Sequence, residues 1–185
     1  GMIYGSVGSL NMADVARLMP TLAEDQHKLA VAGGLMLFVV FGIKAAMLPL
    51  GFWLPKTYAV ATTPVAALFT IMTKVGVYAI LRINGTVFDD EYSHQILMNC
   101  LLVIGLITSV YGVICAIGTE RLRRFIGFMV LSSVGTILVA IGMNTTAAWA
   151  GALYYMVHST LIGAAFYILS GWITSQRGEF KDHFK

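Results

Sequence analysis

Long runs of apolar residues alternate along the chain with short polar stretches. Each run is near the ~20 residues with which an α-helix crosses about 30 Å of hydrocarbon. Gly1–Leu10 reads as the end of one span, and the polar stretch Asn11–Lys28 as an external loop with a short surface helix. The full spans are predicted at Leu29–Leu54, Thr63–Ile83, Gln95–Ile117, Phe125–Met143 and Ala147–Ile173. The pattern therefore predicts an all-α, polytopic transmembrane helix bundle with five full spans plus the end of a sixth.

Lys44 and Pro49 interrupt the first full span near its middle. Proline removes one backbone hydrogen bond and clashes with the preceding turn, so the helix is expected to break near Lys44–Gly51. A short polar turn is predicted to follow at Pro55–Tyr58. Transporters place ion sites at such breaks, although an ordinary proline kink is the alternative interpretation of Pro49.

The composition also indicates a membrane protein. Of the 185 residues, 58% are hydrophobic and 11% are charged, whereas soluble domains carry about 25% charged residues. No basic run, zinc-ligand spacing or stacking platform argues for nucleic-acid binding. No Walker loop, dinucleotide fingerprint, hydrolase elbow or metal-ligand cluster indicates a cofactor, a metal site or an enzyme active site.

The distribution of lysine and arginine predicts the orientation. If the loops alternate sides, one side holds seven basic residues and the other holds three: Lys56, Arg121, Arg123, Arg124, Arg177, Lys181 and Lys185 against Arg17, Lys28 and Arg82. By the positive-inside rule the first side is cytoplasmic. The charged tail Thr174–Lys185 is then expected in the cytoplasm of a multi-pass plasma-membrane protein, and the acidic loop Asp89–Glu91 outside.

Lys44 and Lys74 lie inside apolar runs, whereas all nine Asp and Glu residues fall in loops or tails. A lysine at mid-bilayer costs about 2.5–3.5 kcal/mol on insertion scales, so it usually faces a bundle interior or a hydrated path. Desolvation favours the neutral amine and a nearby carboxylate favours the charged one. A lysine that is alternately paired and unpaired can therefore load and release a proton. Snorkelling to the interface, or binding of carbonyls freed by a kink, is the alternative.

Other polar residues inside the spans are candidates for the same path. His158 lies in the last span with Tyr154 one turn away on the same face, and imidazole chemistry suits proton relay; a histidine hydrogen-bonded between helices is the alternative. Ser132 and Thr136 share one face of the fourth span and can hold ordered water, although helix packing is the simpler role.

Small residues line one side of the third span, at Gly105, Ser109, Gly112 and Ala116. This spacing lets two helix backbones approach closely in a membrane. The stripe therefore predicts packing rather than a binding site.

Several stretches resemble a known family: Phe41–Tyr58 with K-A-A-M-L-P-L-G-F-W-L-P-K, Thr63–Arg82 with I-M-T-K-V-G-V-Y-A-I-L-R, Glu120–Ser133, and Tyr154–Ser170 with Y-Y-M-V-H-S-T-L-I-G-A-A-F. Together they resemble the D subunit of Mrp/Pha-type monovalent cation/proton antiporters. That subunit is similar to the antiporter-like, proton-pumping subunits of respiratory complex I.

The resemblance implies that residues 1–185 belong to a single antiporter-like transmembrane domain, from the end of the family's helix six to helix eleven. Lys44 would be the broken-helix lysine, Lys74 the lysine of helix eight, and His158 part of the central polar axis. The family's glutamate partner of the broken-helix lysine would precede Gly1, and its second broken-helix ionisable residue would follow Lys185. Gly163 stands where some relatives place a lysine.

The implied function is that of a proton-translocating membrane subunit of a multisubunit Na⁺ or K⁺/H⁺ antiporter, a transporter subunit rather than an enzyme. Its expected partners are other membrane subunits, protons, Na⁺ or K⁺, and the lipid bilayer. Two alternatives stay open at this point. One is a proton-pumping subunit of a respiratory complex I or hydrogenase-type complex, and the other is a non-transporting membrane scaffold.

Overall fold

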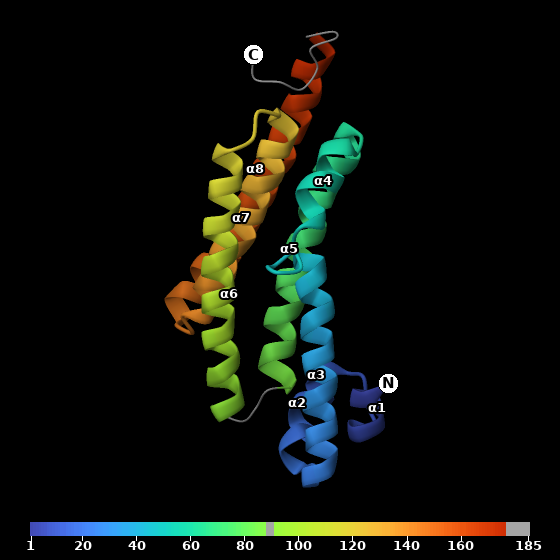
Figure 1. Ribbon diagram of the computed structural model, residues 1–185. Helices are drawn as coiled ribbons and strands as arrows, with labels where there is room; N and C mark the ends of the chain where they lie inside the picture. The colour runs from blue at the N-terminus through green and yellow to red at the C-terminus, as the bar shows by residue number, and fades with distance from the viewer. Residues whose placement is uncertain (88–90, 177–185) are drawn as a thin grey trace.

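The computed structural model describes residues 1–87 and 91–176 as an elongated bundle of helices (Figure 1). The helices are α1 (Met2–Val7), α2 (Met12–Leu18), the 3₁₀ turn η1 (Met19–Thr21), α3 (Glu24–Ala45), α4 (Trp53–Val60), α5 (Thr63–Val87), α6 (Glu91–Ile117), α7 (Leu122–Gly142) and α8 (Thr146–Gln176).

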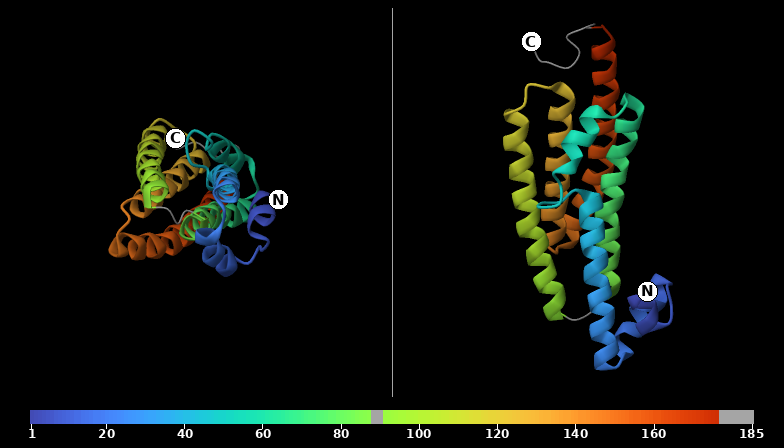
Figure 2. Two further views of the ribbon diagram at one scale, coloured as in Figure 1. Left: turned by 90° about the horizontal axis from the view of Figure 1, so that it is seen from below. Right: turned by 45° about the vertical axis from the view of Figure 1, so that its right-hand side comes forward.

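Five of the described helices are long and apolar enough to cross a membrane: α3, α5, α6, α7 and α8. The short helix α4 continues in the direction of α3 after a break, so the two together form one interrupted pass (Figures 1 and 2). The chain then runs back along α5 and alternates direction through α6, α7 and α8. The prediction of an all-α, multi-span bundle with one broken helix is confirmed.

Some predicted boundaries were wrong. The stretch Pro55–Tyr58, predicted as a turn, lies inside α4. A proline is tolerated there because the first-turn N–H groups of a helix have no intrahelical acceptor. The Thr57 hydroxyl, which donates to the Trp53 carbonyl at 2.8 Å, forms part of the same helix. The break is therefore confined to the segment between Ala45 and Trp53.

The end of the bundle opposite α4 follows the predictions more closely. The expected surface helix is α2, whose N-cap Asn11 accepts a hydrogen bond from the Ala13 N–H at 3.1 Å through its side-chain oxygen. The helix α6 begins at Glu91, within the predicted loop. Asp89 and Asp90 of the acidic loop, and the tail beyond Gln176, lie outside the described residues.

Helix α7 occupies the centre of the bundle and packs against α4, α6 and α8. Most of its residues are buried, whereas only a minority of the residues in α3, α6 and α8 are buried. The exposed side chains of these outer helices are largely apolar. This distribution is the one expected for a bundle bounded by lipid.

Helices α6 and α7 approach each other through glycine. A Cβ atom added at Gly135 would lie 2.3 Å from the backbone nitrogen of Ser109, and one at Gly142 would lie 2.6 Å from that of Leu102. On the α6 side, a Cβ at Gly105 would lie 2.7 Å from the Val139 nitrogen. The predicted role of the small-residue stripe in helix packing is confirmed.

Candidate functional site

The break after α3 is built by a defined helix end. Ala46 has a left-handed backbone with φ 61°; its N–H donates to the Ile43 carbonyl at 3.0 Å, and the Met47 N–H donates to the Gly42 carbonyl at 3.1 Å. These two bonds form the Schellman pattern that terminates helices. The prediction of a break near Lys44–Gly51 is confirmed, because the helix stops at Ala45 and resumes at Trp53.

Neighbouring groups satisfy backbone atoms that the break frees. The Leu48 N–H donates to the Thr108 hydroxyl of α6 at 3.1 Å, and the Trp53 indole N–H donates to the Ile43 carbonyl at 3.0 Å. Gly51 is required for the fold of this segment, since a Cβ there would lie 2.1 Å from the Ala46 carbonyl oxygen. Irregular backbone at membrane depth persists only where such partners cover it.

Lys74 on α5 is buried, with 4% of its surface exposed. Its amine donates to the Ser133 hydroxyl of α7 at 2.6 Å, and that hydroxyl donates its own proton to the Val130 carbonyl at 2.7 Å. Among the side chains that the structure describes, no carboxylate pairs with Lys74. The serine lone pairs can accept from the amine in either protonation state, so the site does not hold the lysine permanently charged.

Lys44 lies in the last turn of α3, directly before the break, and its side chain is exposed on the surface of this chain. The backbone of α5 meets α3 at this turn, because a Cβ at Gly76 would lie 2.7 Å from the Ala45 nitrogen and 3.1 Å from the Lys44 carbonyl carbon. Gly76 is two residues from Lys74, about 3 Å along the helix. The two lysines therefore lie at nearly the same depth, midway along α5.

Buried hydroxyl groups are found on one side of Lys74. Towards α4, Thr70 and Thr73 are fully buried, and the Tyr58 hydroxyl donates to the Phe69 carbonyl at 2.6 Å. The Tyr167 hydroxyl, also buried, has no hydrogen-bond partner within the described residues. Towards the opposite end, the core is mainly apolar, with Val77, Ile80 and Met98 among its side chains, and Asn84, which is buried there against Met98, carries an amide rather than a hydroxyl. Lys74 thus lies at the boundary between a hydroxyl-containing half and a mainly apolar half.

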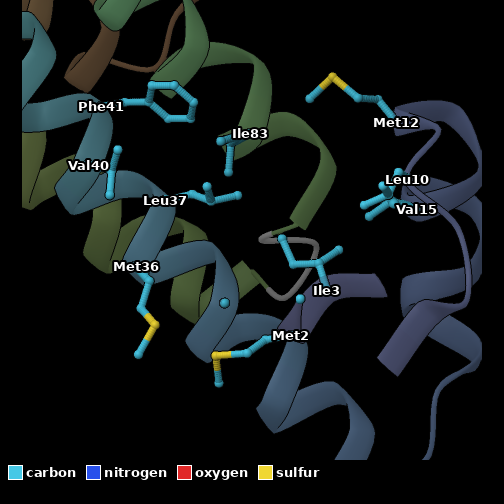
Figure 3. Close-up of a pocket in the computed structure, with 12 residues that line it drawn as sticks. Met2, Ile3, Leu10, Met12, Val15, Met36, Leu37, Val40, Phe41 and Ile83 are labelled. Atoms are coloured by element: carbon cyan, nitrogen blue, oxygen red, sulfur yellow. The ribbon is translucent and has the colours of Figure 1, made fainter. Parts of the chain in front are cut away.

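A cavity of about 440 Å³ between α1, α2, α3 and α5 is a separate feature (Figure 3). Its lining includes Met2, Met12, Met36 and Phe41, and no lining residue has a titratable side chain. Within the described residues it is therefore an apolar cavity, and Lys44 and Lys74 do not line it.

A family model described as "NADH:quinone oxidoreductase/Mrp antiporter, TM" matches residues 1–185. The chain belongs to this antiporter family. It is 41% identical over 170 residues to the D subunit of a probable K(+)/H(+) antiporter from Rhizobium meliloti (strain 1021), covering 91% of this chain and 32% of that protein. It is 32% identical over 186 residues to the D subunit of the Na(+)/H(+) antiporter from Bacillus subtilis (strain 168). That match covers 99% of this chain and 36% of the Bacillus subtilis protein.

Solved structures of two assemblies are similar in fold to this family member. One is the Mrp complex from Dietzia sp. DQ12-45-1b, with a TM-score of 0.80 and 29% identity over 94% of this chain and 31% of that one. The other is the membrane-bound sulfane sulfur reductase, an archaeal respiratory membrane complex, with a TM-score of 0.81 and 25% identity. The match covers 93% of this chain and 35% of the chain in that complex. The chain spans about a third of the length of the curated relatives it matches.

His158 and Tyr154 lie on the outer face of α8 in this antiporter-family chain. Their rings stack, with centroids 6.1 Å apart and an interplanar angle of 14°, and Tyr154 is 75% exposed. The buried face of α8 carries Gly163 instead, where a Cβ would touch Thr70 of α5. Since Gly163 is five residues, or about 140° around the helix, from His158, the structure does not bring the histidine to Lys74.

Ser132 and Thr136 face α6. Both hydroxyl oxygens lie 3.4 Å from the Ser109 hydroxyl oxygen, and the Thr136 hydroxyl also donates to the Ser132 carbonyl at 3.1 Å. Neither hydrogen-bonds Lys74 in the part of the chain that the structure describes. The hydroxyl that does so is the adjacent Ser133, on a different face of α7.

Sequence reasoning missed three residues that build the site: Ser133, Thr108 and Gly76. A glycine in the middle of a helix indicates a close backbone approach, so Gly76 could have been singled out two residues after Lys74. No signal in a single sequence says which hydroxyl of α7 faces the lysine. The pairing of Thr108 with the break, 60 residues apart in sequence, has no local signal either.

Proposed function

We propose that this chain is part of the proton-translocating membrane subunit of a multisubunit Na⁺ or K⁺/H⁺ antiporter. The observation that carries the proposal is the buried Lys74, whose amine is held by a neutral hydroxyl beside a broken helix. The names of the relatives from Rhizobium meliloti and Bacillus subtilis, both antiporter D subunits, support it. Residues 1–185 then form part of one antiporter-like domain, corresponding to the end of the family's helix six through helix eleven.

In this mechanism a proton reaches Lys74 from the α4 end, where Thr73, Tyr58 and Tyr167 place hydroxyl groups. Protonation creates a buried cation without a carboxylate partner among the described side chains, and such a cation is unfavourable. The proton therefore moves on when a more favourable site opens. By the lysine and arginine count, the α4 end is the cytoplasmic one.

Lys44 and His158 take part through surfaces that this chain leaves exposed. An exposed lysine at this depth needs a polar partner, because a bare amine in hydrocarbon is costly. We assign that role to a carboxylate from a transmembrane segment outside these residues. Another transmembrane segment outside these residues would also cover the face of α8 that carries His158 and Tyr154. The proton path would then continue from Lys74 along that face. Moving one unit charge across a membrane potential of 100 mV releases or requires about 2.3 kcal/mol. This free energy sets the scale on which proton movement can drive cation export.

The experiment compares lysine variants in the protein that contains this chain, assembled with its partner subunits in inverted membrane vesicles. Lys44→Ala and Lys74→Ala are expected to abolish cation-dependent proton movement, read with a pH-sensitive dye. Lys28→Ala is the matched control, because Lys28 is exposed and pairs with Glu24 at 2.7 Å. Exchange at the control rate in both variants would indicate a scaffold with inert lysines.

Proton pumping driven by redox chemistry in partner subunits is the second candidate. It is favoured by the similarity to the archaeal respiratory complex, with a TM-score of 0.81. The lysines would do the same work, but the driving reaction would differ. Purification of the intact assembly separates the two: co-purifying quinone- or iron–sulfur-binding subunits support redox pumping, and their absence from an active assembly supports antiport.

A further inference from the structure

A pocket of about 310 Å³ lies at the α4 end of the bundle, between α4, α6 and α7. A water molecule takes up about 30 Å³ of liquid, so this pocket has ample room for a phosphate group. It is separate from the lysine site, since neither Lys44 nor Lys74 lines it. The lining residues are Phe52, Pro55, Lys56, Tyr111, Arg124 and Phe128.

The pocket combines two cations from different helices. Lys56 comes from α4 and Arg124 from the first turn of α7. The Arg124 Nε atom is buried and has no hydrogen-bond partner among the described residues. Neither cation pairs with a carboxylate of a described side chain, and Glu120, which is exposed, does not line the pocket. Arg124 as a whole is partly buried, and a guanidinium whose buried Nε–H has no acceptor can bind an anionic ligand in such a pocket.

Aromatic rings form the rest of the wall. Phe52 and Tyr111 meet edge to face with centroids 5.7 Å apart, and Tyr111 and Phe128 meet similarly at 6.5 Å. Tyr111 lies six residues before the end of α6, about 9 Å along the helix. This is the depth at which aromatic side chains border lipid headgroups. The ligand must therefore present both an anionic group and an apolar part.

We propose that this pocket binds the phosphate group of an anionic phospholipid. Its acyl chains would follow the exposed apolar side of α6, where Ile107 and Val103 lie successive turns below Tyr111. The lysine and arginine count places this end in the cytoplasmic leaflet, whose anionic lipids attract basic residues. A lipid in the pocket ties α4, the second half of the broken helix, to α6 and α7.

The test is a lipid titration of the intact protein in detergent, followed by native mass spectrometry. Phosphatidylglycerol is expected to bind more tightly than phosphatidylcholine. Lys56→Gln and Arg124→Gln should each weaken phosphatidylglycerol binding about fivefold, and the double variant should remove the preference. Arg124→Lys, which keeps the charge, should retain most of the preference and covers the case in which Arg124→Gln does not fold. Lys28→Gln, at the opposite end, should bind like the parent protein.

Three outcomes would overturn the proposal. One is equal affinity of the parent protein for the two lipids. Another is a double variant that keeps its preference for phosphatidylglycerol. The third is displacement of phosphatidylglycerol by an excess of inorganic phosphate, because the site would then recognise a free anion rather than a lipid.

Discussion

Helices α6 and α7, here called the paired helices, differ from the broken-helix region formed by α3, α4 and α5. The paired helices are continuous and meet through Gly105, Gly112 and Gly135, with the Ser109 hydroxyl between Ser132 and Thr136. The broken-helix region has an interrupted backbone and both intramembrane lysines. The paired helices bury only small, neutral polar groups at their contact, whereas the broken-helix region holds groups that can change charge.

The two regions are joined where the candidate chemistry lies. Thr108 of α6 accepts the Leu48 N–H of the break, and Ser133 of α7 accepts the Lys74 amine. The contrast indicates a division of work: a rigid pair supplies fixed hydrogen-bond partners, and an adjacent irregular region supplies the titratable groups. Substitutions in each region, and at the link between them, can test that division.

The largest effect is expected when the close approach of the paired helices is lost. In Gly135→Ala the new Cβ would lie 2.3 Å from the Ser109 backbone nitrogen, so the helices must separate. Overpacking of this kind costs about 1–3 kcal/mol or more. Thermal unfolding of the purified protein should show a marked loss of stability, together with loss of transport.

Gly151→Ala is the matched control, because a Cβ at Gly151 meets no atom within 4 Å. Replacement of an exposed helical glycine by alanine is expected to stabilise slightly, by about 0.5–1 kcal/mol. Equal destabilisation by both substitutions would show that the glycine contact does not hold the paired helices together.

A smaller effect is expected at the link between the regions. Ser133→Ala removes the acceptor of the Lys74 amine and leaves a buried polar group unsatisfied, at a cost of about 1–3 kcal/mol. Because the charged amine loses more than the neutral one, cation/proton exchange should slow and require a lower pH. Ser132→Ala, which alters a hydroxyl that does not contact Lys74, should exchange normally; similar losses in both variants would contradict a specific role for Ser133.

The sequence predicted the broken-helix region better than the details of its surroundings. Lys44 and Pro49 are local signals for the break, and Lys74 is too deep in its span to reach the interface, so both features could be read directly. The position of His158 could not, because apolar residues are spread around every side of α8 and their pattern does not mark the face that meets the bundle. The sequence of α7 likewise does not show which of its hydroxyl groups faces α5. Ser132 and Thr136 were therefore the predicted path residues, whereas the structure shows that Ser133 contacts Lys74.

The smallest effect is expected at Tyr167, whose buried hydroxyl has no partner among the described residues. Tyr167→Phe should leave stability within about 0.5 kcal/mol of the parent, since no hydrogen bond is lost. If the hydroxyl-containing half supplies protons to Lys74, the exchange rate should fall measurably, while Tyr4→Phe, on the exposed surface of α1, should leave the exchange rate unchanged. A Tyr167→Phe protein with an unchanged exchange rate would exclude this hydroxyl from the path.

Substitution of Lys74 by arginine tests most directly whether this amine must release its proton. Arginine preserves the positive charge but stays protonated at every physiological pH. Proton flux in proteoliposomes containing the intact assembly is therefore predicted to be as low for Lys74→Arg as for Lys74→Met, with subunit association intact. Flux at the parent rate in the arginine protein would show that a fixed charge suffices, and would contradict proton transfer through Lys74.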